Sequence, residues 1–188
     1  MTRITANLPW QLENPVKRKV KAERYPSESA YGVGVLTWDV YSRQPHLLTG
    51  PLLQEHWVVV NAFVEELLVE LGEPKLPTGD RLPYRFTVTV PAALMPLVRV
   101  RVKELRYKSL SAYVSGLIIF DLKRRTPTEK GVPHHKTAPL MREPDWIRKA
   151  VFTQLAEDFG NPDRRWPHGI EGRIDELISL QRELPLKP

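Results

Sequence analysis

The chain has 188 residues and a formal net charge of +6 at pH 7, with 28 Lys and Arg against 22 Asp and Glu. It has no cysteine, which excludes disulfides and thiolate metal sites. No apolar stretch reaches membrane-spanning length and the first residues lack the apolar run of a secretory signal, so we expect a cytoplasmic protein. The excess of positive charge favours a polyanionic partner.

The first half of the chain is repeated in the second half. Residues 3–45 align without a gap with residues 85–127, and a weaker likeness joins 51–74 to 139–162. The identical pairs include Arg3/Arg85, Thr5/Thr87, Pro9/Pro91, Val16/Val98, Tyr25/Tyr107, Ser27/Ser109, Tyr31/Tyr113, Gly34/Gly116 and Asp39/Asp121. A match held at one register over this length predicts two similar structural units, followed by a tail, 163–188.

Each unit opens with a strict alternation of polar and apolar residues, RITANLP (3–9) and RFTVTVP (85–91). A period of two predicts a β-strand with one apolar face and one polar face. In the first unit, Arg3, Thr5 and Asn7 should lie on the polar face and point away from the core. Proline has no N–H for a strand ladder, so each strand should end at its proline.

Helices should follow each strand. PVKRKV (15–20) has its two valines at helical spacing, and LVRVRV (97–102) fits either a strand or a helix, so only a helix satisfies both copies. Ser27 and Ser109 are placed as N-caps of a second helix. A glycine inside this helix, Gly34 or Gly116, predicts the close approach of another helix. Further helices are expected at 53–71, 145–159 and 169–184.

A polar-faced strand, a helix, a short turn and a serine-capped helix, found twice over 3–44 and 85–126, resemble the ribbon-helix-helix superfamily, to which the Arc and methionine repressors belong. The resemblance implies that two strands pair as an antiparallel ribbon above four helices, and that the ribbon lies in the DNA major groove. We expect the two strands to pair within one chain, giving a covalently linked pseudo-dimer. Reciprocal pairing between two chains is the alternative.

The resemblance also implies which residues contact DNA. Its base-reading positions fall on Arg3, Thr5, Asn7, Arg85, Thr87 and Thr89. Arginine can bond guanine, asparagine can bond adenine, and threonine can meet a thymine methyl group; alternatively, the six residues only form the solvated face of a sheet. Because Asn7 has Thr89 as its counterpart in the second unit, the preferred target should be an imperfect palindrome.

Phosphate contacts in the superfamily come from the start of the second helix, which places them here on Ser27, Ser29, Ser109 and Ser111. Alternatively, these serines are only helix caps, and the two roles are compatible with each other. The inter-helix turns, 25–27 and 107–109, depart from the family pattern because they lack a glycine. The basic first helices, with Lys17 and Arg99, either add non-specific attraction to the DNA backbone or form a solvated face.

We expect neither an enzyme nor a metal or cofactor site. His134 and His135 lie in a proline-bearing loop without an acidic or thiol partner at ligand spacing, and no nucleotide-binding or catalytic motif occurs. The final helix lies outside the duplication, which makes 163–188 the expected protein-binding segment.

The expected fold is mainly α-helical with a short two-stranded antiparallel ribbon, built as a tandem ribbon-helix-helix pseudo-dimer with extra helices. The two ribbon-helix-helix units are expected at 1–45 and 84–127. A connecting helix with a linker occupies 46–83, and a loop with C-terminal helices occupies 128–188. The expected function is sequence-specific binding of double-stranded DNA, as a monomer or a higher assembly, in a transcriptional regulator or mobile-element accessory factor. The alternatives are a protein-interaction module and an architectural DNA-binding protein without sequence preference.

Overall fold

The computed structural model of the protein describes residues 1–42, 57–73, 82–124, 137–159 and 169–183. The elements, in chain order, are β1 (Thr2–Leu8), the 3-10 turn η1 (Trp10–Leu12), α1 (Glu13–Ala22), α2 (Glu28–Ser42), α4 (Trp57–Glu70), β2 (Tyr84–Val90), α5 (Met95–Glu104), α6 (Leu110–Arg124), α7 (Thr137–Arg142), α8 (Asp145–Phe159) and α9 (Gly169–Glu183). The prediction of a mainly helical chain with a two-stranded antiparallel ribbon is confirmed. No helix in the described ranges is long and apolar enough to cross a bilayer.

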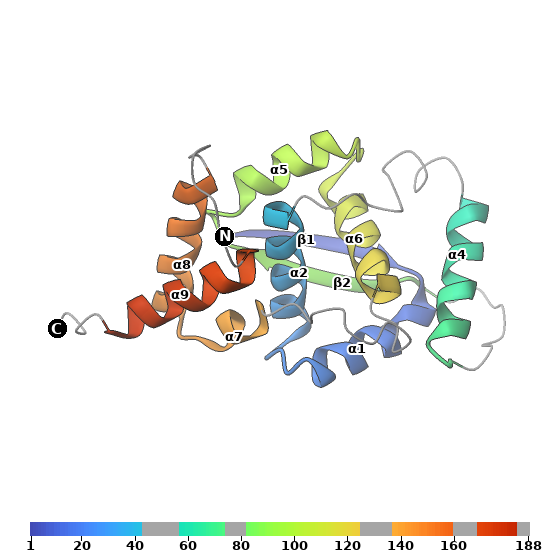
Figure 1. Ribbon diagram of the computed structural model, residues 1–188. Helices are drawn as coiled ribbons and strands as arrows, with labels where there is room; N and C mark the ends of the chain where they lie inside the picture. Colours follow the sequence, from blue (N-terminus) through green and yellow to red (C-terminus); the bar gives the residue numbers. More distant parts are fainter. Residues whose placement is uncertain (43–56, 74–81, 125–136, 160–168, 184–188) are drawn as a thin grey trace.

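Figure 1 shows the ribbon running across the middle of the view, with helices in front of it and beyond its edges and ends. Helices α2 and α6 lie in front of it, α1 runs below it and α5 above it. Helix α4 lies at one end of this body, and α7, α8 and α9 lie at the other. One side of the ribbon is therefore covered by helices.

Strands β1 and β2 pair antiparallel within this one chain. Each ends before its proline, as the sequence predicts, because Pro9 and Pro91 have no N–H to donate. The register sets Thr5 opposite Thr87, which are equivalent positions of the two repeats. The ribbon is therefore symmetric about its centre at the level of the repeated sequence.

Helices α1 and α5 resolve the ambiguity of the basic segments in favour of a helix. In α5, Val98 is buried whereas Val100 is 45% exposed, an outcome that a strand with both valines on one face would not give. Val16 of α1 is buried at the position equivalent to Val98. The helical period therefore decides which of the alternating valines enters the core.

The turn after each of these helices contains an arginine in the left-handed backbone conformation. Arg24 and Arg106 both have φ of 58°. The N–H of Tyr25 donates to the carbonyl of Val20 at 3.0 Å, and Arg24 N–H donates to Lys21 at 3.1 Å, which is the Schellman ending of a helix. The second unit repeats both bonds. Arginine thus occupies the position that glycine takes in most such turns, and the missing glycine does not change the hydrogen bonding of the turn.

We expect Arg106→Gly to be more stable than Arg106→Ala by about 0.5–1 kcal/mol in urea unfolding. Both substitutions remove the same exposed side chain, so the difference between them isolates the cost of a Cβ atom at φ of 58°. Glycine avoids this cost but gains more freedom in the unfolded chain, which keeps the effect small. Equal stability of the two variants would contradict left-handed strain at this turn.

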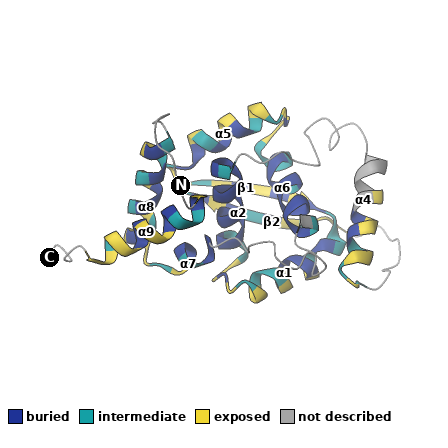
Figure 2. Ribbon diagram, viewed as in Figure 1, coloured by how far each residue is buried: buried dark blue, intermediate teal, exposed yellow. Residues whose placement is uncertain are grey.

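Helices α2 and α6 form the core of the molecule. Figure 2 shows both as almost wholly buried, and every residue from Ala30 to Tyr41 is buried. α2 packs on β2 and α6 packs on β1. The apolar face of the ribbon supplies the other side of this core through Ile4, Ala6, Leu8, Phe86, Val88 and Val90.

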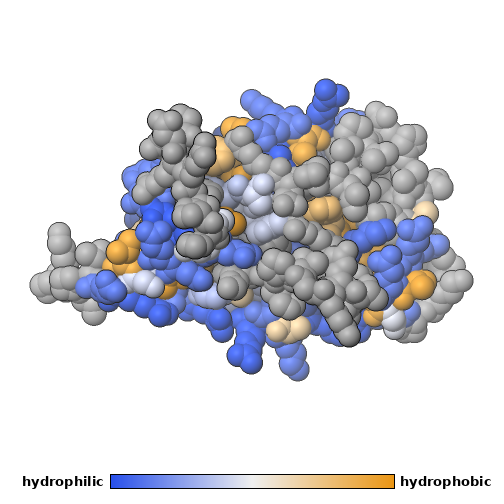
Figure 3. Space-filling model, in the orientation of Figure 1, coloured by the Kyte–Doolittle hydropathy of each residue, from blue (hydrophilic) through white to orange (hydrophobic). Residues whose placement is uncertain are grey.

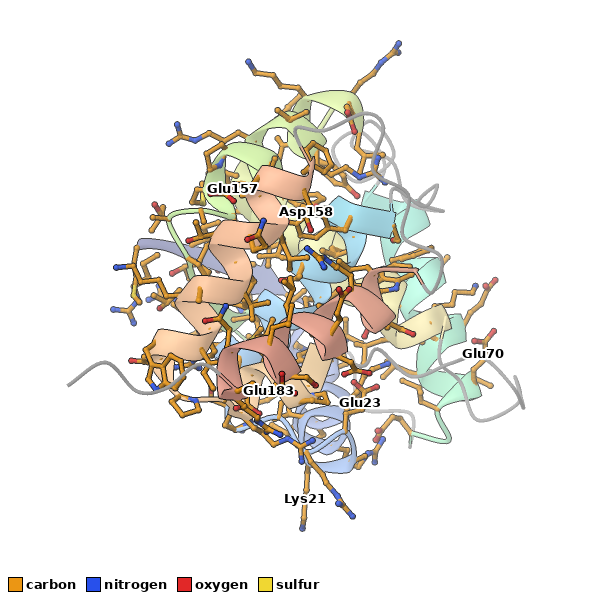
Figure 4. The ribbon with its side chains drawn as sticks, turned by 60° about the vertical axis from the view of Figure 1, so that its left-hand side comes forward. Lys21, Glu23, Glu70, Glu157, Asp158 and Glu183 are labelled. Atoms are coloured by element: carbon orange, nitrogen blue, oxygen red, sulfur yellow. The ribbon has the colours of Figure 1, made fainter. Side chains whose placement is uncertain are left out.

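The remaining helices cover the two central ones from opposite sides. α4 contacts α6, whereas α7 and α9 contact α2. α9 is fixed to α8 by a buried ion pair in which Arg173 Nε donates to Asp158 Oδ2 at 2.7 Å, and Figure 4 shows Asp158 where the two helices meet. Four apolar residues of α9, Ile170, Ile174, Leu177 and Ile178, are buried, whereas Leu180 of the same helix is 47% exposed. Any partner of the described part of this tail would therefore meet the outer side of α9, on which Leu180 is the large apolar side chain that is exposed.

Gly34 lies where α2 and α7 touch, as its place inside an apolar helix predicts. A Cβ atom built on it would lie 2.7 Å from Thr137 Oγ1 and 2.8 Å from the Tyr25 hydroxyl oxygen. These two oxygens are themselves hydrogen-bonded to each other at 2.7 Å. Glycine is therefore needed here for packing.

Replacing Gly34 with alanine should lower the free energy of unfolding by about 1–2 kcal/mol, because overpacking outweighs the better helix propensity of alanine. Urea unfolding followed by circular dichroism measures this change. An unchanged or higher stability would mean that Thr137 and Tyr25 move aside without losing their bond.

Candidate nucleic-acid interface

The outward face of the ribbon carries all six of the predicted base-reading side chains. Arg3, Thr5, Asn7, Arg85 and Thr89 are exposed and Thr87 is half-buried. They alternate with the buried apolar residues, so none of them contributes to the core. Within the described ranges neither Arg3 nor Arg85 takes part in an ion pair, and no carboxylate belongs to this face.

The register of the strands places these side chains in three facing pairs. Thr5 and Thr87 meet at the centre, where their hydroxyl oxygens are 3.3 Å apart. Arg3 lies opposite Thr89 at one end of the ribbon, and Asn7 lies opposite Arg85 at the other end. Each end therefore combines one arginine with one smaller polar side chain, and the two ends differ only in that smaller residue.

Side chains of the central helices α2 and α6 are hydrogen-bonded to the backbone of the ribbon. The N–H of Thr89 donates to Ser29 Oγ at 2.9 Å, and Ser115 Oγ donates to the carbonyl of Asn7 at 3.2 Å. The hydroxyl of Tyr84 donates to Glu28, and burial together with this bond raises the pKa of Tyr84. The polar face is thus presented on a rigid support, which is what a specific binding surface requires.

The predicted phosphate-binding serines lie at the starts of α2 and α6. Ser27 Oγ accepts the N–H of Ala30 at 3.0 Å, and Ser109 Oγ accepts the N–H of Ala112 at 3.0 Å. The prediction that both serines cap their helices is therefore confirmed. Of the second pair of serines, Ser29 is bonded to the ribbon, and Ser111 is half-buried near the start of α6.

The two helix starts differ in charge. The first residue of α2 is Glu28, and the equivalent residue of α6 is Leu110. A carboxylate at a helix start repels an anion that the N-terminal dipole would otherwise attract. The two ends of the surface should therefore attract phosphate unequally.

The predicted basic contacts, Lys17 and Arg99, both have exposed side chains. Lys17 Nζ pairs with Glu13 at 2.6 Å, and this bond raises the pKa of the lysine. Arg99 forms no ion pair among the described residues. Figure 3 shows hydrophilic residues along the upper edge of the molecule over α5, and Figure 4 shows Lys21 pointing away from the protein.

One basic residue in each of these helices, Arg101 in α5 and Lys19 in α1, binds an aspartate of the other repeat. This role was not predicted from the sequence. Arg101 of α5 is buried, and its Nε donates to Asp39 Oδ2 of α2 at 3.0 Å. The hydroxyl of Tyr113, in α6, donates to the same oxygen at 2.5 Å. Burial lowers the pKa of Arg101, but the bond and the charge of Asp39 outweigh it and the net direction is upward. Burial and Asp39 raise the pKa of Tyr113, so its hydroxyl stays protonated.

The equivalent residues form a second cluster with the roles of the two units exchanged. Lys19 Nζ of α1 lies 3.2 Å from Asp121 Oδ2 of α6. The hydroxyl of Tyr31, in α2, donates to that oxygen at 2.7 Å. Each aspartate is thus held by a cation and a tyrosine of the other repeat. A carboxylate repeated at the same place in two apolar helices is the signal that could have found these clusters.

Two segments considered in the sequence lie wholly or partly outside the described residues. His134 and His135 belong to the undescribed segment 125–136. The first residues of the expected protein-binding tail, 163–168, belong to the undescribed segment 160–168. In the part of the chain that is described, no group of His, Asp and Glu has a metal-binding arrangement.

Comparisons with protein-family models, curated proteins and solved structures found no match to this chain.

Proposed function

We propose that the repeats are two ribbon-helix-helix units forming a pseudo-dimer, and that their ribbon binds the major groove of double-stranded DNA in a sequence-specific manner. One observation carries the proposal: six polar side chains form the outward face of a ribbon whose centre joins equivalent residues of the repeats. Two of the six are arginines that form no ion pair with any described residue. The two aspartate clusters support the pseudo-dimer, because the buried Asp39 of the first unit and the buried Asp121 of the second each bind side chains of the other unit.

The dimensions and chemistry of the ribbon suit the groove. The major groove is about 12 Å wide and admits a two-stranded ribbon, whose strands lie about 4.8 Å apart. Arg3 and Arg85 offer forked donors for guanine, and Asn7 offers a donor and an acceptor for adenine. The formal net charge of +6 favours the approach of a polyanion.

The target should be a nearly symmetric sequence with different ends. Arg3 and Arg85 would read equivalent bases of two half-sites, whereas Thr89 and Asn7 would read different ones. The protein would act as a transcriptional regulator or as an accessory factor of a mobile element, as the resemblance implies.

Selection of bound fragments from a random DNA pool tests the proposal. We expect an imperfect palindrome, bound by one chain, with an affinity that falls steeply as the salt concentration rises. Sedimentation of the free protein should give a compact monomer. Recovered fragments without a common sequence would favour an architectural protein, and recovery of none would favour a protein-interaction module.

A further inference from the structure

A cavity of about 610 Å³ opens beside one end of the ribbon. Its walls come from the start of α2, the end of β2 with the residues after it, and one side of α8. The lining residues that decide what can bind here are Ser27, Ser29, Val33, Thr89, Lys149 and Phe152. This volume lies within the range of about 300–1,000 Å³ that is usual for small-molecule sites.

The walls are mostly apolar. Val33 and Phe152 are buried side chains, and alanines from two elements face the same space. An occupant therefore needs an apolar body, because a fully hydrated molecule would lose its water without compensation here.

The polar groups of the cavity mainly donate hydrogen bonds. Ser27 Oγ and Ser29 Oγ already accept backbone N–H groups, so each hydroxyl keeps its proton for an occupant. Asp145, the carboxylate in the wall, is paired with Arg148. Lys149 is exposed and has no ion pair among the described residues. The cavity thus offers two hydroxyl donors and the positive charge of Lys149, which no described carboxylate pairs with.

We propose that this cavity binds a small organic anion with an apolar body, of the kind represented by a medium-chain carboxylate. Its acidic group lies against Ser27, Ser29 and Lys149, and its apolar part lies between Val33 and Phe152. Resting on the proposed function, we further infer that the ligand weakens DNA binding. It occupies the serines proposed to hold a phosphate and lies against Thr89 of the reading face.

Decanoate is the probe, and 8-anilinonaphthalene-1-sulfonate is the fluorescent reporter. One reporter molecule should bind per chain and be displaced by decanoate, but much less by decanol, which lacks the charge, or by acetate, which lacks the apolar chain. Lys149→Gln should weaken decanoate binding at least fivefold, whereas Lys103→Gln, which removes an exposed lysine of α5, should not.

Thr153→Trp should fill the cavity and abolish displacement. Ser179→Trp is its matched control, because both hydroxyls bond a backbone carbonyl four residues earlier on an exposed helix face, at 2.9 and 3.0 Å. Displacement that survives Thr153→Trp, or that decanol produces as well as decanoate, would overturn the assignment of the cavity.

The regulatory step is measured separately by DNA binding. Decanoate should raise the dissociation constant for a selected DNA fragment at least fivefold in the wild-type protein, and should have no effect on Thr153→Trp. Normal DNA binding that decanoate leaves unchanged would overturn the regulation. Decanoate binding by a protein that binds no DNA would overturn the proposed function and with it the regulation, while leaving the cavity assignment standing.

Discussion

Replacing Asp39 with asparagine is expected to lower the free energy of unfolding by about 3–5 kcal/mol, the cost of breaking a buried ion pair by removing one partner. The side chain of Arg101 is only 8% exposed and stays charged at any pH the protein tolerates. Asparagine keeps the shape of aspartate and can still accept from Tyr113, so the loss reports the missing charge. Urea unfolding of both proteins measures the difference.

Two further variants serve as controls for this result. Glu13→Gln removes the exposed partner of Lys17 and should cost less than about 1 kcal/mol, because water screens such pairs. Asp121→Asn should cost less than Asp39→Asn, since Lys19 there keeps a second carboxylate, that of Glu23, whose side chain is only 10% exposed. The second carboxylate beside Arg101 is that of Glu104, which is 38% exposed and therefore more screened by water. If Asp39→Asn proves as mild as Glu13→Gln, the cluster does not join the two halves in the way described.

The second large effect is expected for Arg3→Ala and Arg85→Ala on DNA binding. Each should lower affinity for the preferred site by about 1–3 kcal/mol, or roughly five- to 150-fold, because each would remove one of the bidentate base contacts that we propose. The loss should be confined to one base pair in each half-site, and binding to unrelated sequences should change little. Fluorescence anisotropy against a set of single-base variants of the selected site measures both quantities.

Arg99→Ala is the matched control, since it also removes an exposed arginine but lies on α5 and not on the ribbon. If Arg99 contacts a phosphate, its loss should weaken binding to all sequences alike. The slope of log affinity against log salt concentration should then become shallower by about one. If Arg3→Ala gave this uniform pattern too, the ribbon would contact the DNA backbone and not the bases.

The sequence predicts the local elements well because their signals are periodic or lie at fixed positions. Alternation gives the strands, proline gives their ends, and Ser27 and Ser109 give the helix starts. The duplication adds a second reading of each element, which removed the ambiguity of 97–102. The pairing of the strands is what the resemblance to the ribbon-helix-helix superfamily implies, since one such unit cannot bury its apolar faces alone.

The sequence does not predict how individual polar side chains are used, because this depends on contacts between distant segments. Lys17 and Lys19 stand two positions apart in the same basic run, yet one is exposed and the other meets Asp121 across the molecule. Ser29 was predicted to hold phosphate, and its oxygen also anchors β2. The cavity arises where α8 passes the start of α2, which no local pattern records.

The two strands of the ribbon belong to a single polypeptide, and this sets how its occupancy of a target would respond to dilution. A ribbon assembled from separate subunits falls apart at low abundance, so its binding rises with the square of the subunit concentration. Here strand pairing is intramolecular and survives any dilution. A cell holding a handful of copies would lose binding only in proportion to their number, with no threshold below which the reading surface ceases to exist.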